Sequence, residues 1–178
     1  LEGQLPSGLT TLNNLVELRL FSNYFNGWLP KDIGNLKNLR HLELYNNNFE
    51  GSIPLSIGNL KNLRTLNLSS NSLSCKIPLA LTTLKSLKVL SLFDNKLFGT
   101  IPSSISELSN LEALILSNNK FTGTLPKEMV QLKKLKTLLL RNNVLAGRYV
   151  FYKHELPNLV DFDIDESNLE SDLATLDD

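Results

Sequence analysis

A short pattern, LxxLxLxxN, recurs along the chain at a fixed spacing of 24 residues. The copies begin at Leu15, Leu39, Leu63, Leu87, Leu111 and Leu135. They end at Asn23, Asn47, Asn71, Asn95, Asn119 and Asn143. Self-similarity at one period of this length is typical of proteins that stack one structural unit on the next. The pattern therefore predicts a repeat protein in which each unit contacts only its neighbours.

The same period divides the whole chain. Residues 1–14 form the second half of a repeat, and full repeats begin at the leucines named above. Residues 159–178 form a partial repeat, which we expect to cap the C-terminal end of the stack. Because stacked repeats share one continuous core, we predict a single domain over residues 1–178.

Alternate residues within each copy of the pattern have opposite character. In the second repeat Leu42 and Leu44 are apolar, whereas Glu43 and Tyr45 point to the other face, a period of two that is typical of a short strand. With one strand per repeat and a return path of about 20 residues, successive strands must be parallel neighbours in one sheet. Glycine and proline in the second half of each repeat favour turns and short 3₁₀ segments there.

The asparagine that ends each copy lies where the chain leaves the sheet. Backbone groups lose their ladder partners at that turn, and an amide side chain offers both donors and an acceptor. We therefore predict that the asparagines form a structural ladder, each satisfying backbone groups of its own and of adjacent repeats.

The complete repeat, LxxLxxLxLxxNxLxGxIPxxLxxL, resembles the plant-type leucine-rich repeat of 24 residues. Residues 63–73, followed by Ile77 and Pro78, make a near-consensus copy, and the resemblance covers residues 1–148 well and 149–178 less closely. It implies an α/β, right-handed solenoid with a concave parallel β-sheet, a second shorter sheet and a convex side of 3₁₀ helices and turns. Members include receptor-kinase and receptor-like ectodomains and polygalacturonase-inhibiting proteins, which recognise ligands and are not enzymes.

The sequence departs from this family in its cysteines and near its C-terminal end. Plant ectodomains of this class usually carry paired cysteines in terminal caps, whereas the single cysteine here excludes a disulfide within the chain. Cys75 replaces the glycine of its repeat, and we expect it to be a buried small residue. The segment 147–154 lacks the Ile-Pro pair and places Lys153 at an apolar position.

In this family, ligands usually meet the outward residues of the concave sheet. Exposed aromatic side chains anchor interfaces, and an apolar patch on a rigid surface suggests binding. The candidate ligand-binding residues are Arg19, Phe21, His41, Glu43, Tyr45, Val89, Phe93, Ile115, Leu139 and Arg141. We expect Arg19 and Glu43 to form a weak surface ion pair. The alternative is a neutral surface with scattered apolar residues.

Asn67 begins the only N-glycosylation sequon, Asn-Leu-Ser. In a secreted eukaryotic protein, a glycan there would block the middle of the concave face and shift binding toward lateral residues such as Trp28 and Phe98. In other settings the triplet is only a common form of the repeat.

Two further groups of charged residues allow two interpretations each. The first is a basic column, which is either a solvated rim or a docking strip for an acidic partner: Lys37, Lys61, Lys85 and Lys133. The second group comprises Asp161, Asp163 and Asp165. Three carboxylates on one strand face could chelate a cation, but we expect them to repel further repeats and cap the stack. We therefore predict no metal site.

Composition limits the possible functions. The formal net charge of +0 gives no global field for nucleic acid, and no apolar run is long enough to span a membrane. The two histidines are more than four repeats apart, and nothing resembles a nucleophile–base pair. We therefore predict no enzymatic activity and no cofactor.

The favoured function is recognition of a protein or peptide by the concave and lateral surfaces, in an extracellular receptor or secreted protein, with a co-receptor as a further partner. One alternative is a secreted inhibitor of a cell-wall glycosidase. Another is an intracellular scaffold or a microbial effector, which would place the chain in the cytoplasm.

Overall fold

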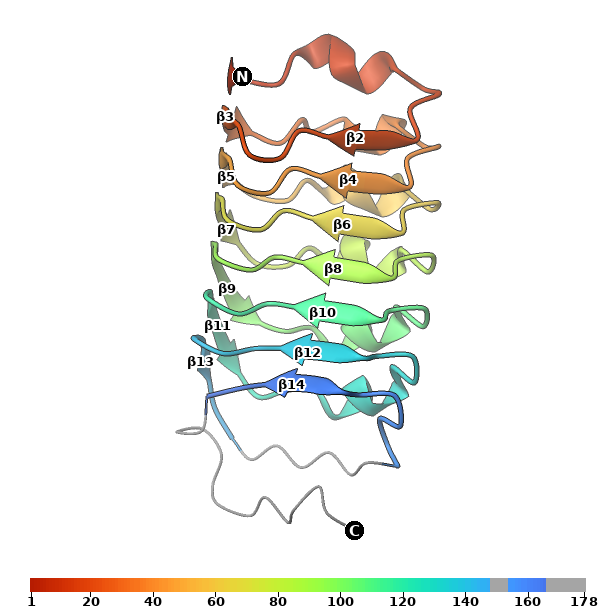
Figure 1. Ribbon diagram of the computed structural model, residues 1–178, viewed down its shortest axis with the longest axis vertical. Coiled ribbons are helices and arrows are strands. Elements are labelled where there is room, and N and C mark those ends of the chain that lie inside the picture. Colours follow the sequence, from red (N-terminus) through yellow and green to blue (C-terminus); the bar gives the residue numbers. More distant parts are fainter. Residues whose placement is uncertain (148–153, 166–178) are drawn as a thin grey trace.

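The computed structural model describes residues 1–147 and 154–165. The chain winds into a stack of coils, in which each coil contributes one strand to each of two sheets (Figure 1). Most of the atypical segment 147–154 and the acidic residues from Glu166 onward lie outside the described residues, and so do Tyr149, Val150 and Lys153. The predicted solenoid with a concave parallel sheet is confirmed.

The concave sheet contains seven parallel strands of three residues each, paired in sequence order. They are β2 (Glu17–Arg19), β4 (His41–Glu43), β6 (Thr65–Asn67), β8 (Val89–Ser91), β10 (Ala113–Ile115), β12 (Thr137–Leu139) and β14 (Asp161–Asp163). Leu18 faces Leu42, and Leu42 faces Leu66, so equivalent residues of successive repeats lie side by side. The register of the sheet therefore follows the sequence period.

A second parallel sheet forms the lateral face of the stack. Its strands are β1 (Glu2–Gly3), β3 (Tyr24–Trp28), β5 (Asn48–Gly51), β7 (Ser72–Cys75), β9 (Lys96–Thr100), β11 (Lys120–Gly123) and β13 (Val144–Leu145). The second sheet that the family resemblance implies is therefore present, but it is not the shorter of the two. It also has seven strands, and β3, for example, has five residues where the concave strands have three.

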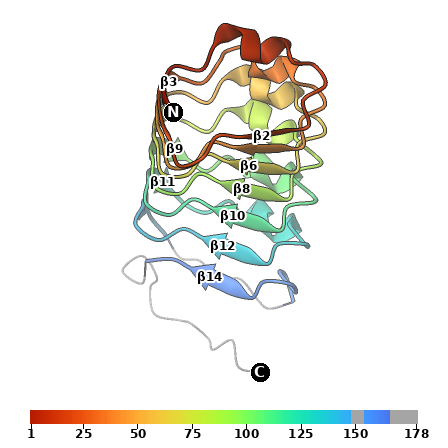
Figure 2. The same ribbon diagram turned by 45° about the horizontal axis from the view of Figure 1, so that its top comes forward.

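Six short 3₁₀ helices of the described residues lie on the side opposite the concave sheet (Figure 2). These are η1 (Ser7–Thr11), η2 (Ile33–Asn35), η3 (Leu55–Asn59), η4 (Leu79–Thr83), η5 (Ser103–Glu107) and η6 (Lys127–Gln131). Five of the six follow a proline, whose fixed φ and missing N–H suit the first turn of a helix. Within the described residues, no helix is long and apolar enough to cross a membrane.

The core consists of apolar columns that run through the stack. Leu66, Leu90 and Leu114 are all 0% exposed. Burying one such side chain is worth about 1.5–3 kcal/mol. Phe25 and Phe49 stack in the next column with ring centroids 6.3 Å apart. Each repeat buries its leucines only when it lies between two others, so the stack is stable where a single coil is not.

The predicted asparagine ladder is confirmed, and Asn95 shows how it works. Its Oδ1 accepts a hydrogen bond from the Leu73 backbone N–H at 2.9 Å. Its Nδ2 donates to the carbonyl oxygens of Leu68 at 3.0 Å and Leu92 at 3.2 Å. One amide therefore binds backbone groups of two successive repeats, as the sequence predicts.

The prediction that Cys75 is buried is wrong. The residue is exposed, and its φ of 82° matches the 82° of Gly99 one repeat later. A side chain at this position lies on the outer surface of the lateral sheet, because the left-handed turn carries it away from the core. The apolar character of cysteine suggested burial, but the backbone at this position does not allow it.

Candidate ligand-binding surface

The ten candidate residues all lie on the outward face of the concave sheet or directly beyond its strands. Equivalent outward residues are register partners, so His41 lies beside Glu17 and Thr65, and Ile115 lies beside Leu139. Strands in a sheet are about 4.8 Å apart, so the outward side chains form continuous columns. Because the stack fixes the strand positions, the arrangement of these side chains is set before any ligand arrives.

The N-terminal part of the face carries an aromatic pair. The rings of Phe21 and Tyr45 stack with centroids 4.6 Å apart and planes inclined by 4°. Phe21 is 38% exposed, whereas Tyr45 and Phe93 are half-buried. The prediction of exposed aromatics is therefore confirmed for Phe21, while the other two rings expose only part of their surface.

The charged candidates Arg19, Glu43 and Arg141 all take part in ion pairs. Arg19 Nε lies 3.1 Å from Glu43 Oε1, and a guanidinium Nη1 of the same arginine lies 3.2 Å from Glu17 Oε2. This confirms the predicted surface pair and extends it to a third residue. Arg141 Nε lies 3.2 Å from Asp163 Oδ1 at the other end of the sheet. Both concave arginines thus lie beside a carboxylate.

Polar side chains occupy the middle of the face. His41 Nδ1 lies 3.1 Å from Thr65 Oγ1. The hydroxyls of Ser69 and Ser91 lie 2.6 Å apart, and both residues are buried. The sequence carries no signal for this contact, since serine alone does not indicate which residue it will bond to.

The glycosylation sequon lies within this polar region. Asn67 is half-buried, and its Oδ1 accepts a hydrogen bond from the Ser69 backbone N–H at 3.1 Å. The Ser69 hydroxyl is the one that bonds to Ser91. Glycosylation of Asn67 stays a prediction, and a glycan there would project over the central strands of the concave sheet.

Apolar side chains continue the face toward its C-terminal end. Val89, Ile115 and Leu139 lie on three adjacent strands, β8, β10 and β12, and all three are half-buried. Ala113 is the register partner of Val89. A ligand that covers these residues would bury the remaining apolar surface, which favours association.

The acidic residues at the C-terminal end of the face act on the preceding repeat. Asp165 Oδ2 accepts hydrogen bonds from the backbone N–H groups of Asn142 at 2.8 Å and Asn143 at 3.3 Å. Asp163 pairs with Arg141. These contacts join the last described strand to the preceding repeat, and the capping role stays a prediction. Across residues 1–147 and 154–165, no group of three or more His, Cys, Asp or Glu residues is arranged to hold a metal.

Comparisons with known proteins agree with this architecture. Three family models, each described as a leucine-rich repeat, match residues 14–36, 37–80 and 85–145. A search of curated protein sequences found no match.

Solved structures give closer relatives. The receptor-kinase ectodomain GASSHO1/SCHENGEN3 of Arabidopsis thaliana, in complex with CASPARIAN STRIP INTEGRITY FACTOR 2, is 39% identical with a TM-score of 0.85. The Arabidopsis receptor kinase HAESA, in complex with the peptide hormone IDA and the co-receptor SERK1, is 30% identical with a TM-score of 0.86. A protein of Leptospira interrogans, LIC12759, is 38% identical with a TM-score of 0.76.

Each alignment covers 92% of this chain. The chain in turn spans 19%, 28% and 40% of these three proteins, respectively. It therefore corresponds to a fraction of their length, about seven repeats of a longer stack in the receptors.

Proposed function

Because the chain belongs to the leucine-rich repeat family, we propose that it is a recognition module that binds an extended peptide or a protein segment on its concave face. We place it in an extracellular receptor or a secreted protein. The proposed partners are a peptide ligand and a co-receptor that binds beside it. The proposed role of the chain is binding and not catalysis.

The observation that carries this proposal is the aromatic pair of Phe21 and Tyr45 on a rigid face. Aromatic side chains with few rotatable bonds bind at a low cost in conformational entropy. The stacked geometry fixes both rings further, because each restricts the other. Along the stack the face changes from polar at His41 to apolar at Ile115, so a bound segment would meet different chemistry along its length.

The relatives support the same reading. The GASSHO1/SCHENGEN3 and HAESA structures are plant receptor kinases solved with partners, the second with both a peptide hormone and a co-receptor. Their identity to this chain extends over 92% of it. An extracellular location follows from the proposal that this chain serves in the same way.

The glycosidase-inhibitor alternative is less well supported. It expects an unpaired basic cluster on the concave face, to match an enzyme that acts on acidic substrates. Arg19 and Arg141 both pair with carboxylates in this structure. No feature of the described residues favours an intracellular scaffold over ligand recognition.

The test is selection of binding peptides from a displayed random-peptide library, followed by affinity measurements on the enriched peptides. We expect the double substitution Phe21→Ala with Tyr45→Ala to weaken binding at least tenfold, about 1.4 kcal/mol. Trp28→Ala is the matched control, since Trp28 is a 74% exposed aromatic on the lateral sheet.

Two results would contradict the proposal. One is a library that yields no enriched peptide. The other is a set of enriched peptides that lose affinity with Trp28→Ala and keep it with the concave double variant, since that would place the binding surface on the lateral sheet.

A further inference from the structure

Exposed basic residues gather along one edge of the solenoid, where the chain returns from the 3₁₀ helices to the concave strands. This edge lies at the strand starts, on the right in Figure 1. We define the basic edge as six exposed residues: Lys37, Arg40, Lys61, Arg64, Lys85 and Lys88. The repeat pattern predicts the lysine column of this set, whereas the second column beside it was not predicted. The second column contains Arg40, Arg64 and Lys88, each of which directly precedes a strand.

The residues of the second column are neighbours in space. The backbone N–H of Arg64 donates to the Arg40 carbonyl oxygen at 2.8 Å, and that of Lys88 donates to the Arg64 carbonyl oxygen at 2.8 Å. The backbone positions that carry successive cations are therefore adjacent in the sheet, about 4.8 Å apart. Like charges on directly opposite residues of neighbouring strands are destabilising. The fold thus maintains an arrangement that an anionic partner would relieve.

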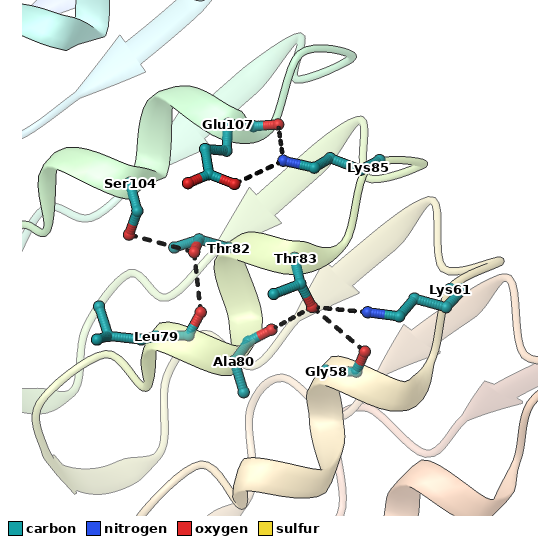
Figure 3. A network of polar contacts seen from close by, with 9 residues as sticks. All are labelled: Gly58, Lys61, Leu79, Ala80, Thr82, Thr83, Lys85, Ser104 and Glu107. Carbon is teal, nitrogen blue, oxygen red and sulfur yellow. Dashed lines mark hydrogen bonds and ion pairs between the residues drawn. The ribbon is translucent and has the colours of Figure 1, made fainter.

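The C-terminal part of the edge carries its own anions. Glu112 lies between two lysines, with Oε2 at 2.8 Å from Lys136 Nζ and Oε1 at 2.9 Å from Lys88 Nζ. Lys85 Nζ lies 2.8 Å from Glu107 Oε2 (Figure 3). These contacts show that a carboxylate placed on this column is bound by cations of two repeats at once.

The N-terminal part has no such partners. Lys61 Nζ lies 2.8 Å from the neutral Thr83 hydroxyl (Figure 3). In the part of the chain that the structure describes, no carboxylate lies within ion-pairing distance of Lys37, Arg40, Lys61 or Arg64. Four cations on two adjacent loops are therefore left without a counter-charge from the described residues.

The backbone beneath these cations is held in place. Asn38 Nδ2 donates to the Asn13 carbonyl oxygen at 2.8 Å, and Asn62 Nδ2 donates to the Lys37 carbonyl oxygen at 3.0 Å. These bonds tie each loop to the one before it. The edge is thus a fixed row of flexible cationic side chains on rigid loops.

We propose that the basic edge binds the carboxylates of an acidic peptide segment, whose remainder lies on the concave face beside His41 and Thr65. This inference rests on the proposed function and specifies the chemistry of the ligand. Arg40 directly precedes His41 and Arg64 directly precedes Thr65, so a peptide that follows β4 or β6 runs from the concave face onto the edge. Guanidinium groups bind carboxylates through two parallel hydrogen bonds, which suits the two arginines to this role.

The experiment uses a fluorescent oligoglutamate peptide and measures its binding to the chain by fluorescence anisotropy. We expect binding that weakens as salt rises, because exposed charges are screened, and none with oligoglutamine of the same length. The double substitution Arg40→Gln with Arg64→Gln should weaken binding about tenfold. Both residues are exposed, so an unchanged unfolding curve would show that the variant still folds.

The matched control is Lys96→Gln with Lys120→Gln. These lysines are exposed on β9 and β11 of the lateral sheet, so this variant makes the same change in net charge on another face. We expect its affinity for oligoglutamate to stay within about twofold of the parent. An equal loss of affinity in both variants would mean that only the net charge matters, and it would overturn the proposal. Binding of oligoglutamine as tightly as oligoglutamate would also overturn it.

Two further arms separate this inference from other possibilities. Vesicles containing phosphatidylserine should not bind, and binding of vesicles without binding of oligoglutamate would mean that the edge meets a membrane surface. The Phe21→Ala with Tyr45→Ala variant should still bind oligoglutamate, because that probe has no group for the aromatic pair. If the parent protein binds oligoglutamate but no library peptide, the proposed function fails and the basic edge stands. If it binds library peptides but not oligoglutamate, the proposal for the basic edge fails alone.

Discussion

At the scale of single residues, the backbone conformation of each turn determines which side chains are tolerated. The asparagines of the ladder replace hydrogen bonds that the sheet can no longer supply, as the contacts of Asn95 to Leu73, Leu68 and Leu92 show. Cys75 presents the opposite case, since it occupies a left-handed conformation that L-residues adopt only at a cost. The asparagine position is therefore stabilised by side-chain hydrogen bonds. The position of Cys75 favours glycine instead, because a residue without a side chain adopts the left-handed conformation without strain.

The first prediction concerns Asn95→Ala. This substitution leaves the buried Leu73 N–H without its side-chain acceptor. It also removes one of the two amide donors to each of the Leu68 and Leu92 carbonyl oxygens, which keep Asn71 and Asn119, respectively. We expect the free energy of unfolding to fall by about 1–3 kcal/mol. Urea unfolding measures it. Asn23→Ala is the control, because Asn23 lies in the first full repeat and is more exposed, and its loss should be smaller. An unchanged midpoint for Asn95→Ala would exclude a structural role for the ladder.

The second prediction concerns Cys75→Gly. Glycine adopts a positive φ without strain, so we expect the free energy of unfolding to rise by about 1 kcal/mol. Gly99→Ala tests the same position in the next repeat, where a Cβ would lie 2.9 Å from Lys76 Cγ and should destabilise the fold. If both variants matched the parent in denaturant unfolding, backbone strain at this position would be negligible.

At the scale of elements, charged side chains couple the coils more specifically than the leucine columns do. Every repeat presents the same leucines to the next repeat, so these contacts do not distinguish one repeat from another. Glu112, in contrast, contacts Lys88 of the preceding coil and Lys136 of the following one. Hydrogen bonds from Lys136 and then Lys88 lower the pKa of Glu112 from 4.5 to about 2. This carboxylate therefore stays ionised in conditions that protonate ordinary glutamates.

The third prediction follows from that pKa. Because the folded-state pKa is depressed, the stability that Glu112 contributes is complete above about pH 4.5 and is lost as the pH falls toward 2. Glu112→Gln should therefore be less stable than the parent at neutral pH, and the difference should shrink as the pH approaches 2. Unfolding curves of both proteins across this range measure it, and a difference that does not change with pH would contradict the assigned contacts.

At the scale of the whole molecule, stability comes from contacts between neighbours. Each coil packs its leucines between those of the next coils, and distant coils do not touch. The concave face and the basic edge are consequences of the same geometry, since equivalent positions of successive repeats form columns. A change that preserves the period should therefore preserve the fold.

The fourth prediction tests that statement by deletion. Removing residues 87–110 takes out one period and brings Leu111 to the position of Leu87, so every column stays in register. We expect a folded protein that unfolds cooperatively, with lower stability and a smaller dependence on denaturant, because less surface is exposed on unfolding. Removing only residues 87–98 shifts leucines out of their columns and should abolish the fold, as circular dichroism would show.

Much of the surface could be located from the sequence because the period assigns every residue to a column. Phe21 and Tyr45 were predicted on one face, and they lie there as neighbours. The sequence did not indicate that their rings stack, that the Ser69 and Ser91 hydroxyls meet, or that Val89 is half-buried. Those properties depend on side-chain conformations in adjacent coils, which repeat spacing does not specify.

The sequence by itself determined the fold, since leucines and asparagines at a constant spacing can bury their apolar surface and satisfy their turns only by stacking. The tertiary structure decided which charges are neutralised. Arg64 and Lys88 follow the same pattern in sequence, yet Lys88 faces a carboxylate of the next coil and Arg64 does not. The physical reason is that a charge is balanced by whatever lies within a few ångströms in the neighbouring repeat, and that neighbour is a full period away along the chain.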